Sequence, residues 1–205
     1  MQVRNLHSTG WPSNCYLVSE SNDAVIIDPS APASELTRAL ADSALTLRAI
    51  LLTHGHFDHI LSLDALRDAT GAPAYLHCGD AKFLGDPAKS CYLTMIGQNI
   101  RHRPAEIKLK GSAELEFGAL RFTVLPTPGH TEGCVCYRCV DALFTGDTLF
   151  ADGVGRTDLP GGSPAAQRDS LNLLRQLAIR EPSLTIYPGH GGTSSLGAAT
   201  ALCSV

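Results

Sequence analysis

The sequence predicts an α/β (α+β) fold arranged as one domain over residues 1–205. Two observations predict it. Short apolar runs of strand length recur along the chain, and segments with helical spacing of leucine and alanine stand between several of them. A chain of 205 residues is enough for one large core, and no linker, low-complexity tract or short repeat divides it.

Six apolar runs are predicted as β-strands because glycine, proline, aspartate or asparagine bounds each of them. They are residues 15–18, 24–27, 49–52, 120–125, 142–144 and 184–187. The cysteine-rich run 134–139 is predicted as a further strand with Cys134 and Cys136 on one face. No second cysteine pair stands at the spacing of a zinc ribbon, so these residues are predicted to be buried structural thiols.

Three segments are predicted as helices. Residues 34–45 repeat leucine at near-helical spacing, and residues 58–70 do so until a Gly-Ala-Pro run closes the segment. The third helix begins at Pro164 after Ser163 and carries leucine on one face. Between the second and third, Tyr92, Met95 and Ile96 are predicted to pack in the core or a loop, with a lid or pocket wall as the alternative.

The bulk composition excludes two classes of partner. With a formal net charge of −4 and scattered basic residues, the chain lacks the footprint of a protein that binds nucleic acid or an anionic membrane. Residues 1–5 lack the apolar run of a signal peptide, and no window approaches the ~18 apolar residues of a membrane span. The seven cysteines are therefore expected to be reduced, in a cytoplasmic protein.

Histidine or aspartate follows four of the predicted strands, each time in a turn that contains glycine. Because strand ends are rigid and glycine lets the backbone turn sharply, we expect these four turns to converge. The groups are His54, His56, Asp58, His59, His130, Asp147 and His190. Imidazole and carboxylate are ligands of zinc and neighbouring divalent metals. Seven ligands exceed the need of one catalytic ion and suit two ions that share a bridging carboxylate.

Four motifs carry a family resemblance. They are Thr-His-Gly-His-Phe-Asp-His at 53–59, Pro-Gly-His-Thr at 128–131, Gly-Asp-Thr-Leu-Phe at 146–150 and Pro-Gly-His-Gly at 188–191. In this order and spacing the chain resembles the metallo-β-lactamase superfamily, and within it the short bacterial form of glyoxalase II (hydroxyacylglutathione hydrolase). The resemblance implies a four-layer αββα sandwich with the metal site at the edges of two sheets.

The resemblance also implies roles for the seven residues. His54, His56 and His130 would hold one metal, and Asp58, His59 and His190 the other. Asp147 would bridge the two ions, where lactamases of this fold commonly place cysteine. Asp58 and Asp147 are the expected catalytic carboxylates. The expected cofactors are two divalent ions, zinc first, with iron or manganese as alternatives.

The implied reaction is thioester hydrolysis by a metal-bound hydroxide that attacks the carbonyl carbon. Coordination lowers the pKa of water from 15.7 toward about 7. A small-molecule thioester is the expected substrate because its leaving thiolate needs little help from an acid, and no acid is evident in the motifs.

The loop at 153–162 is either a mobile surface loop or a rim that meets substrate. Long glyoxalase II enzymes have lysine where Arg156 stands, and Arg156 would bind a substrate carboxylate in a bidentate way. They have tyrosine where Asp158 stands, and Asp158 would repel an anionic thiol unless it pairs with Arg156. The sequence ends fifteen residues after His190, so the C-terminal helical glutathione-binding domain is not expected, and glutathione specificity does not carry over.

The alternative function is a persulfide dioxygenase with a single iron on the same fold. Such proteins resemble this chain in size and in the Gly-x-Gly-Arg-Thr-Asp loop, here at 153–158. Their iron triad would be His54, His130 and Asp147. The full second set of ligands, including His190, favours the hydrolase. Lactamase, nuclease and non-catalytic metal-binding roles are weaker alternatives. The remaining histidines, His7, His77 and His102, lack a motif and are predicted to be ordinary core or surface residues.

Overall fold

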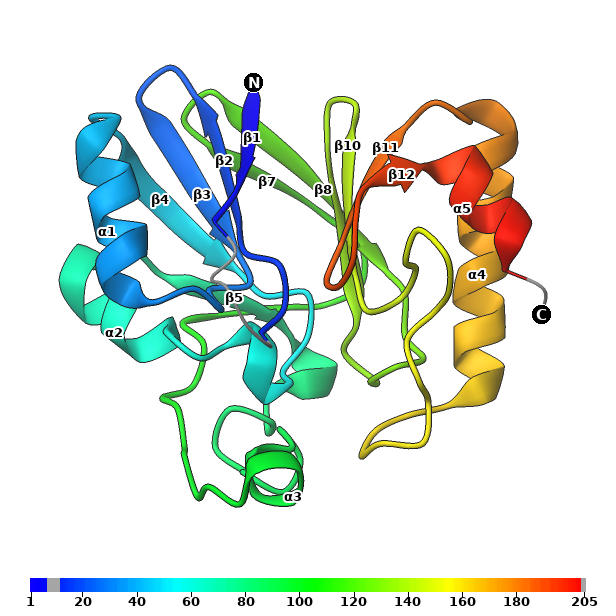
Figure 1. Ribbon diagram of the computed structural model, residues 1–205, viewed down its shortest axis with the longest axis horizontal. Helices are drawn as coiled ribbons and strands as arrows, with labels where there is room; N and C mark the ends of the chain where they lie inside the picture. The colour runs from blue at the N-terminus through cyan, green and yellow to red at the C-terminus, as the bar shows by residue number, and fades with distance from the viewer. Residues whose placement is uncertain (7–11, 204–205) are drawn as a thin grey trace.

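The computed structural model describes residues 1–6 and 12–203, and its strands form two six-stranded sheets packed face to face (Figure 1). The first sheet has the order β1-β2-β3-β4-β5-β6. Its strands are β1 (Gln2–Asn5), β2 (Tyr16–Glu20), β3 (Asp23–Ile27), β4 (Thr46–Leu51), β5 (Ala74–His77) and β6 (Ile107–Leu109). The second has the order β12-β11-β10-β9-β8-β7. Its strands are β7 (Ala113–Phe117), β8 (Leu120–Pro126), β9 (Val135–Cys139), β10 (Ala142–Gly146), β11 (Thr185–Pro188) and β12 (Ser194–Ser195). Both sheets mix parallel and antiparallel pairs.

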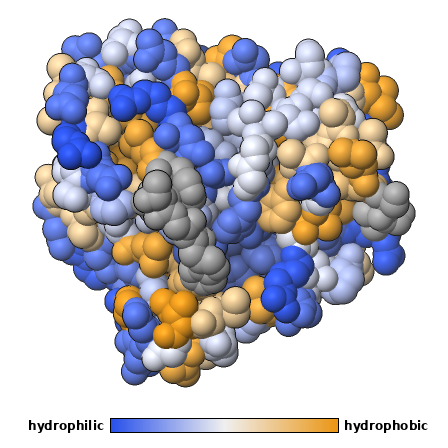
Figure 2. Space-filling model, viewed as in Figure 1, coloured by the Kyte–Doolittle hydropathy of each residue, from blue (hydrophilic) through white to orange (hydrophobic). Residues whose placement is uncertain are grey.

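Helices cover the outer face of each sheet (Figure 1). The first sheet is covered by α1 (Ala33–Asp42) and α2 (Leu63–Thr70), and the second by α4 (Pro164–Arg180) and α5 (Leu196–Leu202). This four-layer order confirms the predicted αββα fold. The short helix α3 (Tyr92–Ile96) lies apart, at the lower end of the molecule in Figure 1, where Figure 2 shows hydrophobic residues gathered on the surface. No helix in the described ranges is long and apolar enough to cross a bilayer.

Alternating side chains divide the interior into three cores. In β3, Val25 and Ile27 face the core between the sheets, whereas Ile26 faces the core beneath α1 and α2. In β10, Phe144 faces the core between the sheets, and Leu143 faces α4 and α5. Strands buried on both faces must be apolar throughout, which is why the sequence shows them as continuous hydrophobic runs. Each such side chain contributes roughly 1.5–3 kcal/mol on burial.

The structure confirms the six predicted strands to within three residues at their ends, together with the cysteine-rich strand β9. Cys134 and Cys136 are buried free thiols, as predicted. Sequence reasoning missed five strands, β1, β5, β6, β7 and β12, and the helices α3 and α5. Most of these are short, and β7 alternates exposed glutamate with leucine, so no continuous apolar run marks it.

The prediction that a helix begins at Asp58 is wrong. Phe57–His59 forms a 3-10 turn, and α2 begins only at Leu63. In a helix that began at Asp58, the Ser62 N–H would donate to the Asp58 carbonyl. It donates instead to the Pro29 carbonyl at 2.9 Å. The Asp58 carbonyl instead accepts the Ser13 hydroxyl at 3.1 Å. Asp58 and His59 therefore lie on a turn anchored to the segment before β2 and the segment after β3.

Candidate metal centre

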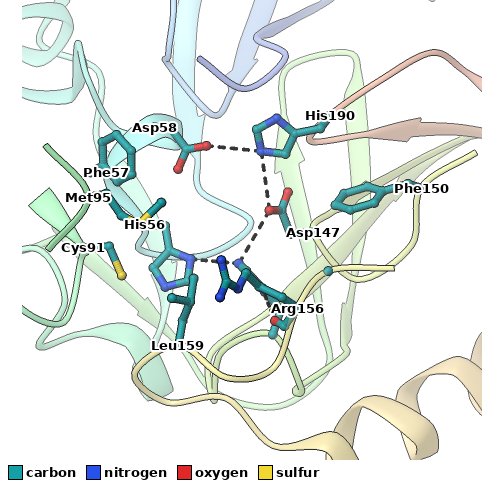
Figure 3. A pocket seen from close by; sticks show the side chains of 12 residues that line it. His56, Phe57, Asp58, Cys91, Met95, Asp147, Phe150, Arg156, Leu159 and His190 are labelled. Carbon is teal, nitrogen blue, oxygen red and sulfur yellow. Dashed lines mark hydrogen bonds and ion pairs between the residues drawn. The ribbon is translucent and has the colours of Figure 1, made fainter. Parts of the chain in front are cut away.

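The four polar turns meet at one edge of the two sheets, and all seven predicted residues lie together there. Figure 3 labels four of them, His56, Asp58, Asp147 and His190. His54 and its neighbours follow β4, and His130 lies between β8 and β9. Asp147 follows β10, and His190 follows β11. The Nδ1 atom of His56 lies 2.8 Å from Nε2 of His130, although 74 residues separate them.

The seven side chains form two sets joined by one carboxylate. The ligand atoms of His54, His56 and His130 lie within 4.8 Å of one another, and so do those of Asp58, His59 and His190. The Asp147 carboxylate lies between the sets. Its oxygens are 3.5 Å from His130 Nε2, 3.3 Å from His59 Nε2 and 3.5 Å from His190 Nε2.

Unpaired atoms inside the cluster show that its donor set fits divalent metal ions. Nε2 of His54 and Nε2 of His56 are buried without a hydrogen-bond partner among the described residues. A buried polar atom left unpaired costs about 1–3 kcal/mol. Neutral imidazole nitrogens and carboxylate oxygens around a common space are what a divalent cation binds. The cluster is therefore a metal-binding site.

A buried aspartate orients the histidine rings. Oδ2 of Asp28 lies 2.8 Å from Nδ1 of His59 and accepts the Thr53 hydroxyl at 2.6 Å. The Thr53 oxygen in turn lies 3.1 Å from Nδ1 of His54. With Nδ1 engaged in this way, Nε2 of both rings faces the cluster. Sequence reasoning missed Asp28, although it follows a predicted strand just as the other site residues do, and its left-handed φ of 51° marks a constrained position.

A second buried carboxylate ties two ligand loops together. Asp80 accepts hydrogen bonds from the Gly55 N–H at 2.9 Å, the Thr131 hydroxyl at 2.8 Å and the Gly133 N–H at 2.8 Å. Burial raises the pKa of Asp80 to about 6, against the lowering effect of these bonds. The loop that carries His54 is thus fixed to the loop that carries His130. No strand or motif in the sequence signalled Asp80.

The pKa shifts separate the ligands that are ready to bind a cation from the one that must first lose a proton. Burial, with neighbouring imidazoles, lowers the pKa of His56 to about 3 and also lowers that of His54, so both rings are neutral near pH 7. Burial opposes the charge on His190, but Asp147 and Asp58 raise its pKa to about 9. Burial likewise opposes the charge on Asp147, but His59 and His190 hold its pKa well below the usual range. Neutral imidazole and ionised carboxylate are the forms that bind metal, so His54, His56 and Asp147 are ready to bind a cation. His190 is protonated near pH 7 and must release its proton when it binds an ion.

A pocket of about 370 Å³ opens beside the cluster. Figure 3 shows Phe57, Met95 and Cys91 on one side of the metal-site residues and Phe150 on the other. The pocket residues besides the predicted ligands are Phe57, Cys91, Met95, Phe150, Gly155, Arg156 and Leu159. For Met95 the predicted packing in core or loop is therefore wrong, and the alternative of a pocket wall holds, because the left-handed turn at Cys91 directs the short helix α3 along the rim.

Arg156 lines the pocket with its guanidinium already paired. Its Nε and Nη2 atoms donate to the two oxygens of Asp158, each at 2.6 Å. The sequence left this pairing open, and the structure contains it. The Arg156 carbonyl also accepts the Nδ1–H of His130 at 2.6 Å, which turns Nε2 of that ring toward the cluster.

Two of the histidines outside the motifs have structural contacts, as predicted. Nδ1 of His77 accepts the Gly79 N–H at 3.3 Å, and His102 lies 2.9 Å from the Tyr92 hydroxyl and 3.1 Å from Asp64. His7 lies outside the described residues.

Comparison with known proteins identifies the family. The family model described as the metallo-β-lactamase superfamily matches residues 8–190. The chain belongs to this superfamily. A relative, the probable metallo-hydrolase YqgX of Bacillus subtilis, is 35% identical over 87% of this chain and 85% of its own length.

Three solved structures are similar to this chain. The BLEG-1 B3 metallo-β-lactamase is 36% identical with a TM-score of 0.85, covering 91% of this chain and 90% of its own. The di-iron-bound form of TTHA1623 is 34% identical with a TM-score of 0.79, covering 97% and 96%. ETHE1 from Myxococcus xanthus is 31% identical with a TM-score of 0.76, covering 96% and 80%.

Proposed function

We propose that the chain is a hydrolase of small-molecule thioesters, similar to glyoxalase II, with two divalent metal ions, zinc first. The observation that carries this proposal is the position of Asp147 between two complete sets of ligands beside a pocket. Two ions held there would lower the pKa of water to about 7 and polarise a carbonyl oxygen. The relative named a probable metallo-hydrolase supports the hydrolytic class.

The pocket walls favour a thioester over an ester or amide. Besides the proposed ligands, the titratable side chains that line the pocket in the described part of the chain are the Cys91 thiol and the Arg156 guanidinium. Burial raises the pKa of Cys91, and Asp158 raises that of Arg156. Neither group is an effective proton donor near pH 7. A thiolate leaves without a proton, whereas an amine or alkoxide needs one.

The protein's own carboxylates have the proposed catalytic roles. Oxygens of Asp58 and Asp147 lie 3.2 and 3.5 Å from His190 Nε2 and line the pocket. From there they accept hydrogen bonds from the attacking water and orient it toward a carbonyl carbon. Arg156 stands at the rim, where it would contact the thiol portion of the substrate. All seven cysteines are free thiols, which supports the cytoplasm as the compartment.

A substrate panel tests the proposal. Protein loaded in turn with zinc, iron and manganese is offered S-lactoylglutathione, a coenzyme A thioester and a neutral N-acetylcysteamine thioester, and thiol release is measured. We expect the wild-type chain to turn over at least one thioester. We expect Asp147→Ala to lower kcat at least about a hundredfold, as is typical when one group that stabilises a transition state is removed. If no thioester in the panel is cleaved with any metal, the proposed function is wrong.

The second candidate function is a persulfide dioxygenase with a single iron. His54, His130 and Asp147 are neighbours in the site, with His130 Nε2 3.5 Å from Asp147, and the loop at 153–158 supports this reading. Metal analysis separates the two candidates. Two metals per chain with thioester turnover favour the hydrolase, whereas one iron with persulfide-dependent oxygen uptake would replace it.

A further inference from the structure

One wall of the pocket is apolar and is built partly by α3. Cys91 and Met95 from the α3 segment, with Phe57 from the 3-10 turn, line the pocket on the side of His56 and Asp58 (Figure 3). We refer to these three residues, Phe57, Cys91 and Met95, as the apolar wall. Met95 remains 47% exposed. An exposed methionine beside a reactive centre is suited to contact with an apolar ligand, because its flexible thioether adapts to different shapes.

The apolar wall is held in place rather than loosely attached. The Phe57 ring packs edge-on against Tyr92 at 5.5 Å, and Tyr92 is buried. The Tyr92 hydroxyl lies 2.9 Å from His102 Nε2, and the Phe57 N–H donates to the Ser90 carbonyl at 2.8 Å. The wall is therefore preformed, so binding an apolar group against it costs little ordering of the protein.

The loop at 153–162 contributes a charged part of the rim, which suits a different part of the substrate. Among the described residues that line the pocket, Arg156 is the only arginine or lysine, and Asp158 holds it in a bidentate pair. The thiol carriers of cells, such as glutathione and coenzyme A, are polar and anionic. A charged rim suits that portion, and the apolar wall is left for the acyl portion.

We propose that the apolar wall binds the hydrocarbon chain of the acyl group, so that the substrates are thioesters of apolar acids rather than short hydroxyacyl thioesters. This inference rests on the proposed thioesterase function. Each methylene buried against the wall adds up to about fourfold in affinity, from ~0.8 kcal/mol per buried methylene. Because the pocket is partly open, we expect at least a tenfold preference in kcat/KM for an eight-carbon acyl group over acetyl.

Acyl-chain selectivity tests the proposal on the metal-loaded protein. S-acetyl, S-butyryl and S-octanoyl N-acetylcysteamine are compared, since they share one neutral thiol. Met95→Gln keeps the length of the side chain and adds an amide, so the ratio of octanoyl to acetyl kcat/KM should fall at least fivefold. Leu93→Gln is the matched control. Leu93 lies on the same helix, is 50% exposed and is not among the pocket-lining residues, so that ratio should stay unchanged.

The outcomes separate this proposal from the one on which it rests. If acetyl and octanoyl thioesters are cleaved equally well, or Met95→Gln leaves the ratio unchanged, the apolar wall does not bind the acyl chain, although the thioesterase stands. If selectivity follows the alkyl length of the thiol in a series of S-alkyl thioacetates, the occupant is the thiol and the proposal is wrong.

If Leu93→Gln and Met95→Gln both lower the molecular mass of the protein in solution, a second copy of this chain covers the surface, and the proposal is also wrong. If no thioester is cleaved, the proposed function itself fails. Calorimetric binding of a non-hydrolysable octanoyl ketone analogue, weaker in Met95→Gln, gives a readout independent of turnover.

Discussion

At the scale of single residues, Asp28 decides how two of the ligand rings face the metal site. It accepts from Thr53 and lies 2.8 Å from His59 Nδ1. Replacing Asp28 with asparagine keeps its shape but removes the charge that favours the bound tautomer. Loss of such a supporting group typically weakens metal binding about 10- to 100-fold.

We therefore expect Asp28→Asn to lower the affinity for zinc about 10- to 100-fold. Competition with a chromophoric chelator measures this affinity. The control is Asp68→Asn, an exposed aspartate paired with Arg103. Equal zinc affinity in the wild-type and Asp28→Asn chains would show that His59 is oriented without the carboxylate.

Asp158 sets the charge that Arg156 presents to the pocket. The side chains of Asp158 and Arg156 are 66% and 57% exposed, so water and salt screen their pairing and it contributes little free energy. Asp158→Asn should release the guanidinium for an anionic thiol. We expect kcat/KM for S-lactoylglutathione to rise about two- to fivefold relative to a neutral thioester, and the gain to shrink as salt screens it.

The double variant Arg156→Ala, Asp158→Asn gives the control for that change. It should lose the gain, since no cation remains to meet the thiol. A gain that persists without Arg156 would mean that Asp158 repels the substrate directly.

At the scale of elements, predictions from sequence succeeded where one physical rule dominated. Buried strands such as β3 and β10 need apolar residues on both faces, so they stand out in the sequence, and the ligand turns follow their ends. Strand β7 and helix α3 obey no such rule. The glutamates of β7 face solvent, and α3 spans Tyr92–Ile96 between two left-handed residues, so their positions depend on tertiary contacts. Asp80 could not be predicted for the same reason, since its three partners lie in distant loops.

The segment around α3 has a pH-dependent anchor in His102. Burial lowers the pKa of His102, against the raising effect of Asp64, so the folded chain binds the proton more weakly than the unfolded chain. The stability that His102 contributes is fully present above the pKa of histidine in the unfolded chain, about 6.5. It is lost as the pH falls through the lower pKa that His102 has in the folded chain. We expect the free energy of unfolding of the metal-free chain, from urea denaturation, to fall between about pH 7.5 and about pH 5.5. His102→Gln should show a smaller fall, and an identical fall in both chains would contradict this assignment.

At the scale of the whole molecule, the metal site joins the two halves of the sandwich. The first sheet supplies the ligands of the 54–59 loop, and the second supplies His130, Asp147 and His190. Two tyrosines fasten these halves reciprocally. The Tyr16 hydroxyl in the first sheet donates to the Pro188 carbonyl at 2.7 Å, and the Tyr137 hydroxyl in the second donates to the Leu52 carbonyl at 2.9 Å. Each acceptor lies two residues before a ligand histidine, so the packing between the sheets sets the spacing of the ligands.

Because the ligands come from both sheets, metal binding should stabilise the whole fold and not one loop. A ligand present at one hundred times its Kd adds about 2.7 kcal/mol, and for a chain of this size 1 kcal/mol moves the unfolding temperature by about 2–4 °C. We expect chelation to lower the unfolding temperature by roughly 5–10 °C, and zinc or manganese to restore it. Calorimetry with and without chelator measures this shift. The unfolding temperature of the Asp147→Ala chain, which lacks the shared carboxylate, should change much less on chelation. If removal of the metal is verified and the unfolding temperature of the wild-type chain does not change, the two sheets hold the site together without the ions.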